Sequence, residues 1–482
     1  MKRIALVLFA LVIARPPLAG QSRDIASDGE FLSTVHLLGT WINARIAYEG
    51  IPGLAIAIVH DNDLVWSRGF GVRDVATRAP VTPQTIFRIA SMTKTFTSTA
   101  TLILRDRGKL DLDDPVAKHL SWFAYKNAYP DEPVTIRHLL THTSGLPREA
   151  AFPYWSENKF PTREQMIEAF KTQESIFEPG TRIKYSNLAM ALLGEVVAKA
   201  SGMPYGQYIQ TAILDPAGMK STSVTLTPEF QKRLATGYGR RMPDGSRKPA
   251  PVMDSRGIAP AANISSTVED MALYAAAHMQ EDRGDAGPLL KPATLREMHR
   301  VSFVNADWDG GYGLGFSVAK TSSRLMYGHG GWAGGHRSQL RISPSEKVAV
   351  IVMLNCDDGD ATMIADRAMA MVAPVISRIA SVPAAEAVPD PAWADYVGTY
   401  TDPDGWESEI LVRKGRLMMY GFSYPPEDNP LGSLVELTPE GPDRFRMTGD
   451  EGNGELVIFE RNPDRTVRRV KATENFIYPV KR

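Results

Sequence analysis

Strand-like segments flank a long helical stretch in this chain, and this arrangement limits the possible folds more than any other part of the sequence. Residues 53–71 hold two β-rich apolar runs joined by the polar turn Asp61-Asn62-Asp63, which is the pattern of a β-hairpin. Three more strand segments follow much later and are joined by short polar turns: 324–332, 337–342 and 348–354. Residues from about 110 to 300 are typical of short helices and loops, and 360–379 of a closing helix. The pattern predicts one α+β domain, in which an antiparallel sheet flanked by helices joins both ends of the chain and the middle forms a mostly helical subdomain.

Two helices are expected around the hairpin, at about 28–48 and 91–107, the second ending at Gly108. Apolar residues recur at helical spacing in the second helix and predict a stripe that faces the core: Met92, Phe96, Ala100 and Ile103. Ser91 and Lys94 lie away from this stripe, with Ser91 in the first turn. The two polar side chains are therefore expected on a face of the helix that the stripe does not occupy.

The chain is expected to divide into four parts. Residues 1–20 have the basic, apolar and small-residue regions of a secretory signal peptide, and 21–380 contain the α+β domain. Residues 381–391 are rich in proline and alanine and predict a linker. Residues 392–482 contain short β-rich segments and predict a small all-β domain, either a meander or a barrel.

The N-terminal pattern predicts a secreted or periplasmic protein. The apolar run Ile4–Ala14 is shorter than the roughly 20 residues that span a bilayer, so we expect no membrane span after signal removal. Gln21 stands where a lipoprotein signal would need cysteine, which disfavours lipid attachment. Cys356 is the single cysteine, so an internal disulfide is impossible and burial in the core is its expected role.

Charge gives no reason to expect a nucleic-acid partner. The chain has 54 Lys and Arg against 55 Asp and Glu, and this balance also disfavours binding to an acidic membrane surface. The oligomeric state is left open by the sequence.

Ser91-Met92-Thr93-Lys94 is the first segment that suggests chemistry. A serine hydroxyl needs a base within hydrogen-bond reach, and a lysine amine can be that base once its charged form is destabilised. Residues three apart on a helix lie on one face, so one rigid turn can hold nucleophile and base. The pattern recurs by chance, however, and a solvated serine and lysine are the alternative.

Tyr185-Ser186-Asn187 precedes a predicted helix at 188–200. A phenol can relay a proton between nucleophile and leaving group, and the Asn187 amide can bind a substrate amide or the lysine. The alternative is a buried tyrosine beside a helix N-cap.

His329-Gly330-Gly331-Trp332 is the third segment. If these residues form an edge strand, the two glycines allow close approach of a substrate backbone. The Trp332 backbone N–H could then pair with that of Ser91 as an oxyanion hole. A glycine-rich turn that contains a histidine is the alternative.

In this order the three segments resemble the serine β-lactamase and penicillin-binding-protein superfamily. Leu139-LTHTSGLP-Arg148 and the stretch 311–318 are similar to segments of its class C-like branch, and the resemblance covers about residues 30–380. It implies that Ser91 is acylated, that Lys94 and Tyr185 share the roles of base and proton relay, and that no metal or organic cofactor is needed. It also implies that Asn187 orients the lysine and the substrate.

The same resemblance assigns the substrate-binding strand to residues 329–332, with the Ser91 and Trp332 backbone amides as the oxyanion hole. Class C β-lactamases have Lys-Thr-Gly where this chain has His329-Gly330-Gly331, and the histidine form is more similar to the esterases and D-amino-acid peptidases. We therefore expect an exported serine hydrolase acting on an ester or a small peptide or D-amino-acid amide. A class C-like β-lactamase and a non-catalytic penicillin-binding-like sensor are the alternatives. The C-terminal part resembles the lipocalin-like domains of some of these peptidases and esterases.

Overall fold

The computed structural model describes residues 24–281, 287–320, 324–381, 390–413, 415–421, 434–449, 452–473 and 475–480. One compact unit is Arg23–Ala380, and a second contains Ser381–Arg482. The predicted signal peptide (1–20) and most of the predicted linker (382–389) lie outside the described residues.

An antiparallel sheet is the framework of the first unit. Its strands among the described residues are β1 (Gly53–His60), β2 (Asp63–Asp74), β3 (Ala79–Pro80), β6 (Phe303–Val304), β7 (Gly310–Tyr312), β8 (Ser317–Lys320), β9 (Leu325–Ala333), β10 (His336–Ser343) and β11 (Val348–Leu354). They lie in the order β3-β2-β1-β11-β10-β9-β8-β7-β6. The two ends of the domain meet where β1 pairs with β11, with Leu54 opposite Leu354 and His60 opposite Val348. The α+β fold with a sheet shared by both ends is confirmed.

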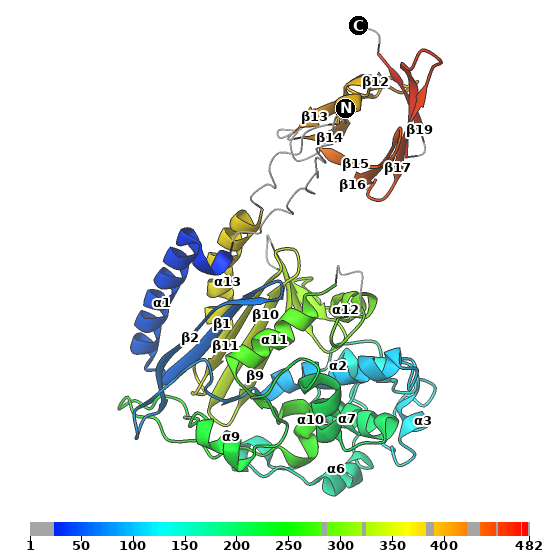
Figure 1. The fold of residues 1–482 in the computed structure, drawn as a ribbon. Helices are drawn as coiled ribbons and strands as arrows, with labels where there is room; N and C mark the ends of the chain where they lie inside the picture. Colours follow the sequence, from blue (N-terminus) through cyan, green and yellow to red (C-terminus); the bar gives the residue numbers. More distant parts are fainter. Residues whose placement is uncertain are drawn as a thin grey trace, which may run out of the picture. The chain divides into compact units, whose positions relative to one another are not determined.

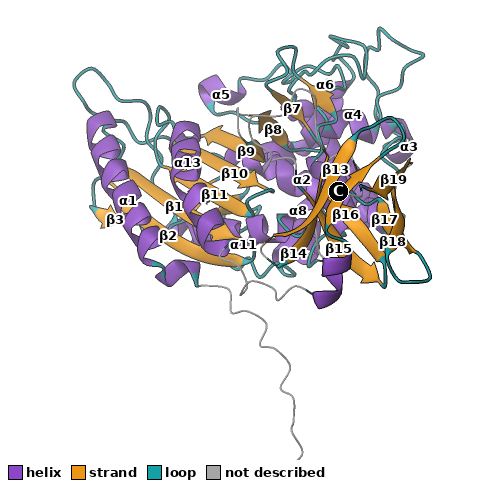
Figure 2. Ribbon diagram, turned by 90° about the horizontal axis from the view of Figure 1, so that it is seen from above, coloured by secondary structure: helices purple, strands orange, loops and turns teal. Residues whose placement is uncertain are grey.

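Both faces of this sheet are covered, which makes three layers (Figures 1 and 2). Helices α1 (Gly29–Glu49) and α13 (Ala361–Ala380) pack on one face, where Leu54, Ile56 and Ile58 of β1 point. Alternate residues such as Ala55 and Ala57 point to the helical region on the other face. Because neither face meets water, β11 and residues 53–59 of β1 are apolar and show no polar alternation.

The helical region lies between β4 (Phe87–Arg88) and β6 in the chain. Its α-helices are α2 (Thr93–Asp106), α3 (Val116–His119), α4 (Ile136–Leu140), α5 (Tyr154–Glu157), α6 (Arg163–Phe170), α7 (Asn187–Ser201), α8 (Tyr205–Ile209), α9 (Pro228–Arg233), α10 (Ala259–Ala262), α11 (Val268–His278) and α12 (Pro292–His299). Strand β5 (Ser265–Ser266) pairs with β4.

Helix α2 is buried on every side, and the predicted one-sided stripe is only part of its packing surface. Each residue of 93–104 is buried, including five threonines. Three of the threonine hydroxyls donate to carbonyls: that of Thr95 to Met92 at 2.8 Å, that of Thr97 to Pro260 at 2.6 Å, and that of Thr101 to Thr97 at 2.9 Å. A polar face can enter the core when its hydroxyls are paired in this way. The prediction that Lys94 avoids the core-facing stripe therefore did not imply exposure.

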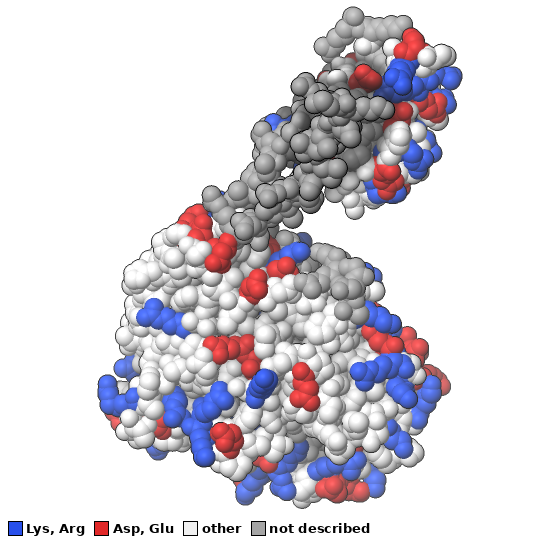
Figure 3. Space-filling view, in the orientation of Figure 1, with Lys and Arg blue, Asp and Glu red and all other residues white. Residues whose placement is uncertain are grey.

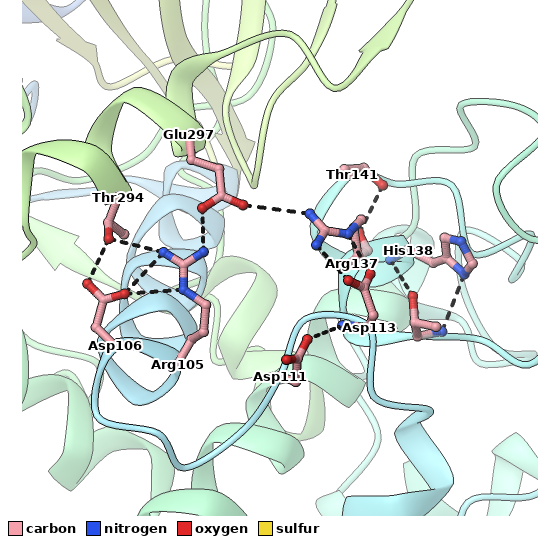
Figure 4. Close-up of polar contacts among 10 residues, drawn as sticks. Arg105, Asp106, Asp111, Asp113, Arg137, His138, Thr141, Thr294 and Glu297 are labelled. Atoms are coloured by element: carbon pink, nitrogen blue, oxygen red, sulfur yellow. Dashed lines mark hydrogen bonds and ion pairs between the residues drawn. The ribbon is translucent and has the colours of Figure 1, made fainter.

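A network of charged side chains fixes the C-terminal end of α2 (Figure 4). Arg105 pairs with Asp106 and with Glu297 of α12, and Thr294 of α12 donates to Asp106 at 2.8 Å. Glu297 also lies 3.7 Å from Arg137 of α4. These contacts tie the end of α2 opposite to Ser91 to two neighbouring helices.

The second unit is a closed barrel, which confirms the predicted small all-β fold. Its described strands pair in chain order and the last pairs with the first: β12 (Gly398–Thr401), β13 (Glu407–Arg413), β14 (Arg416–Gly421), β15 (Val435–Gly441), β16 (Arg444–Thr448), β17 (Leu456–Arg461), β18 (Val467–Ala472) and β19 (Asn475–Pro479). Its interior is apolar, with Tyr400, Ile410 and Phe459 among the buried residues.

Acidic and basic side chains are interspersed over the visible face of the larger unit, in agreement with the small net charge (Figure 3). In the part of the chain that the structure describes, no helix has the length and apolar character needed to cross a membrane. Cys356 is fully buried, as expected.

Candidate active site

Ser91 lines a cavity of about 440 Å³ between the sheet and the helical region. It belongs to a 3-10 turn, η2 (Ala90–Met92), that leads directly into α2. The preceding Ala90 has φ +47°, a left-handed conformation that is strained for a residue with a side chain. Hydrogen bonds on either side hold this turn, from Ile89 N–H to the Ile264 carbonyl at 3.0 Å and from Met92 N–H to the Ile89 carbonyl at 3.1 Å. A strained, well-held turn thus presents Ser91 to the cavity.

Lys94 lies behind Ser91 and is completely buried. Its Nζ is 3.0 Å from Ser91 Oγ and donates to the Ala261 carbonyl of α10 at 2.9 Å. Burial holds the pKa of Lys94 well below its usual 10.5, and the nearby charges of Glu149 and Arg148 act in opposite directions. A lysine in this setting can be a neutral amine and can accept the proton of Ser91.

Tyr185 lines the same cavity, and its ring centroid is 4.8 Å from Lys94 Nζ. Burial raises the pKa of Tyr185 above its usual 10, and the adjacent Ser91 hydroxyl acts in the opposite direction. His142 packs on the ring at 4.5 Å and is bonded to the chain on both sides of it: its carbonyl accepts from Lys184 N–H, and its Nδ1 from Ser186 N–H. Burial lowers the pKa of His142 well below 6.5, so a neutral imidazole holds the phenol in place.

Asn187 begins α7, after the N-cap Ser186. Its Nδ2 donates to Glu149 Oε1 at 2.5 Å, and its buried Oδ1 has no hydrogen-bond partner among the described residues. The second partner of Lys94 is therefore the Ala261 carbonyl, where the sequence suggested the Asn187 amide. Asn187 is coupled instead to Glu149, which the sequence analysis did not single out.

His329 lies on β9 and is neutral. Burial lowers its pKa to about 3. Its Nδ1 lies 2.6 Å from the Gly330 carbonyl, and its Nε2 has no partner within the described part of the chain. The fixed positive charge of a Lys-Thr-Gly strand is thus absent at this position.

Strand β9 is not an edge strand over its whole length. Residues 325–328 pair with β8, and only from His329 onward is β10 the single partner in the described sheet. Gly330, Gly331 and Trp332 of this stretch line the cavity together with Ser91. A Cβ atom at Gly331 would collide with the Ile89 carbonyl and the Ser338 hydroxyl, whereas one at Gly330 would meet the tip of Gln339 at 2.8 Å. Close packing on the Ser91 turn therefore requires Gly331 to be glycine.

The structure brings the sequence-predicted residues together in one place. Ser91, Tyr185, Asn187 and residues 330–332 line the cavity, while Lys94 and His329 are buried beside it. Further lining residues that sequence reasoning missed are Arg148, Trp155, Arg337 and Asp360. Arg148 is the last residue of the segment 139–148, which resembles the family, whereas no local sequence pattern marks Trp155, Arg337 or Asp360.

A serine on a held turn, a buried lysine amine beside it and a glycine-containing strand along one wall define the class of serine hydrolases that includes penicillin-binding proteins and β-lactamases. The Beta-lactamase family model matches residues 39–373. The chain belongs to the β-lactamase family, and it is a serine hydrolase.

Curated relatives agree with this assignment. Penicillin-binding protein 4* of Bacillus subtilis (strain 168) is 26% identical over 443 residues, which cover 85% of this chain and 93% of the relative. D-alanyl-D-alanine-carboxypeptidase/endopeptidase AmpH of Escherichia coli (strain K12) is 27% identical over 318 residues, which cover 64% of this chain and 80% of that protein.

Solved structures show the same similarity. An octameric penicillin-binding protein homologue from Pyrococcus abyssi superposes with a TM-score of 0.61 and 25% identity, over 92% of this chain and 99% of that one. A β-lactamase/D-alanine carboxypeptidase from Yersinia pestis, complexed with citrate, has a TM-score of 0.60 and 26% identity, over 72% of this chain and 99% of that one.

Proposed function

We propose that this protein is an exported serine hydrolase that acts through a Ser91 acyl-enzyme on an ester or on a small peptide or D-amino-acid amide. The observation that carries the proposal is the completely buried Lys94 amine, 3.0 Å from the Ser91 hydroxyl. Burial disfavours its charged form, so the amine can take the serine proton at a pH where an exposed lysine could not.

In the proposed reaction, Ser91 Oγ attacks the substrate carbonyl while its proton passes to Lys94. The raised pKa of Tyr185 keeps the phenol neutral, which favours Lys94 as base and Tyr185 as the relay that carries a proton to the leaving group. The backbone N–H groups of Ser91 and Trp332 stabilise the negative oxygen of the tetrahedral intermediate. The leaving group departs, and water then hydrolyses the Ser91 ester to release the acid.

The substrate preference follows from His329. Because this side chain is neutral, the wall of the cavity lacks the fixed cation that would bind the carboxylate of a β-lactam. A relative named as a D-alanyl-D-alanine carboxypeptidase supports a peptide substrate. A class C-like β-lactamase is the second candidate, since Arg148 and Arg337 line the cavity and supply positive charge from other positions.

We also propose the organisation of the chain: a signal peptide at 1–20, the hydrolase domain at 21–380, a linker at 381–391 and the barrel domain at 392–482. The basic residues Lys2 and Arg3 before the apolar run support export to the periplasm or the exterior.

Covalent labelling tests the mechanism directly. The protein is incubated with a fluorophosphonate and, separately, with a penicillin, and the adduct is located by mass spectrometry. We expect modification of Ser91 that is lost in Ser91→Ala. Ser98→Ala is the matched control, because Ser98 is a buried serine of α2 whose hydroxyl has no partner among the described residues. An unlabelled wild type under both conditions would favour a non-catalytic binding protein.

Substrate comparison then separates the two candidates. Hydrolysis of p-nitrophenyl acetate, nitrocefin and a D-Ala-D-Ala peptide is measured with the same preparation. We expect the ester or the peptide to be the better substrate, and nitrocefin turnover far above both would reverse the preference for a non-β-lactam substrate.

A further inference from the structure

Two tryptophans face each other in the Ser91 cavity. Trp155 comes from α5 in the helical region and Trp332 from β9 of the sheet, and both line the cavity. Their ring centroids are 6.2 Å apart and the ring planes differ by 24°, within the range of offset-stacked aromatic pairs. One aromatic pair thus connects two walls of the cavity whose residues lie far apart in the sequence.

Each indole is held at its polar edge by a carboxylate. Trp155 Nε1 donates to Glu149 Oε1 at 3.0 Å, and Trp332 Nε1 donates to Asp357 Oδ1 at 2.8 Å. The same carboxylate oxygens are held in turn, that of Glu149 by the Asn187 amide and that of Asp357 by the Gly335 N–H at 3.0 Å. The orientation of both rings is therefore set by the protein before any ligand arrives.

Both indole side chains remain partly exposed in the cavity although their N–H groups are satisfied. Trp155 is 37% exposed and Trp332 is 45% exposed. The Arg337 guanidinium lies over the Trp332 ring, 5.3 Å from its centroid, so positive charge borders the aromatic pair.

We propose that Trp155 and Trp332 form an aromatic platform that binds a flat, apolar acyl group of the substrate. This inference rests on the proposed function and narrows its substrate class to esters or amides whose acyl part carries an aromatic or similarly planar group. The backbone N–H of Trp332 is assigned to the oxyanion hole, so the indole of the same residue lies next to the acyl carbon rather than at a remote subsite. Stacking aligns the carbonyl with Ser91 as well as adding affinity.

Three thioesters with the same small leaving group test the platform: the S-ethyl thioesters of phenylacetic, cyclohexylacetic and acetic acid. Hydrolysis releases ethanethiol, which is followed with a thiol reagent. Phenyl and cyclohexyl groups have similar size but only the first is flat, so we expect kcat/KM for the phenylacetyl ester to exceed that for the cyclohexylacetyl ester about tenfold. Trp155→Leu should bring this ratio close to one, and Trp155→Phe should retain most of it.

Trp308→Leu is the matched control, because Trp308 is 77% exposed and does not line the cavity. It should leave the ratio unchanged. A wild-type ratio near one, or an equal loss for all three thioesters in Trp155→Leu, would overturn the platform while leaving the Ser91 mechanism intact. Absence of turnover of every thioester together with absence of Ser91 labelling would instead refute the proposed function.

Binding without turnover gives an independent readout. In Ser91→Ala, tryptophan fluorescence is titrated with phenylacetate and with cyclohexylacetate. Tighter binding of phenylacetate that is lost in Trp155→Leu supports the platform, and equal binding of the two acids contradicts it.

Discussion

Replacing Gly331 by alanine should slow acylation of Ser91 severely, although Gly331 itself has no reactive group. The added Cβ would lie well under 3.0 Å from the backbone carbonyl of Ile89 and from the Ser338 hydroxyl. These two atoms are bonded to each other at 2.9 Å, so neither can move alone. Restoring ordinary contact requires a shift of roughly 1 Å between β9 and the turn that carries Ser91.

The consequence can be given a size. A displacement of about 1 Å at a catalytic group can cost on the order of a hundredfold in rate, equivalent to roughly 2.7 kcal/mol of barrier. Overpacking of the same region should reduce the free energy of unfolding by about 1–3 kcal/mol. Both quantities are measured on one preparation, the first as the rate constant of fluorophosphonate labelling at Ser91 and the second by urea denaturation.

Gly330→Ala is the matched control, one residue away on the same strand. The nearest atom to its Cβ would be the end of the Gln339 side chain, at 2.8 Å, which accepts a hydrogen bond from Thr362 and would have to shift by a few tenths of an ångström, whereas the nearest backbone atom is 3.7 Å away. We expect less than a fivefold change in labelling rate, on the order of 1 kcal/mol of barrier. A wild-type labelling rate in Gly331→Ala, or equal losses of rate in the two glycine variants, would show that Gly331 does not position the Ser91 turn.

Three further predictions concern the titrating groups. Lys94→Met should lower the rate of Ser91 labelling at least about a hundredfold, the usual scale for loss of a general base, and a near wild-type rate would remove Lys94 from the mechanism. The rate of Ser91 labelling in the wild type should fall as the pH falls, because the neutral Lys94 amine becomes protonated, and the midpoint of this pH dependence should lie well below 10.5. His329→Asn should leave the midpoint unchanged, since the His329 imidazole, with a pKa of about 3, is already neutral in this range. Burial also lowers the pKa of His336 to about 3, so as the pH falls this histidine is protonated in the unfolded chain before it is protonated in the folded chain. The contribution of the neutral, buried His336 to the free energy of unfolding is fully present above pH 6.5 and is lost as the pH falls toward 3. In urea titrations at pH 7, 5 and 4, the free energy of unfolding of His336→Asn should therefore fall less steeply than that of the wild type, by about 1.4 kcal/mol per pH unit.

Much of the fold could be predicted because its signals are local. The apolar runs at 348–354 and the spacing of Met92, Phe96 and Ala100 depend on neighbours within a few residues, and the observed β11 and α2 lie where these patterns place them. The burial of α2 on all sides could not be predicted in this way. It depends on Pro260 and other residues far away in the chain, which accept the threonine hydrogen bonds.

The residues of the candidate site likewise fall into those that local sequence patterns indicated and those that they did not. Ser91 and Lys94 were recognisable because one helical turn holds both, and Tyr185 and His329 because they follow in a known order. Trp155 carries no such mark: only the tertiary structure places α5 opposite β9. The Trp155 variants described above test its role.

Local order along the chain accounts for the pairing of Ser91 and Lys94, since their spacing follows from the geometry of a helical turn. The reactivity of these two groups depends on long-range packing. The pKa of Lys94 is depressed because residues from distant parts of the chain, with Ala261 in contact, exclude water from its amine. Likewise, Gly331 is required because Ile89 packs against it, not because of its neighbours in the chain. Desolvation and close contact are properties of the folded chain, and no short stretch of sequence contains them.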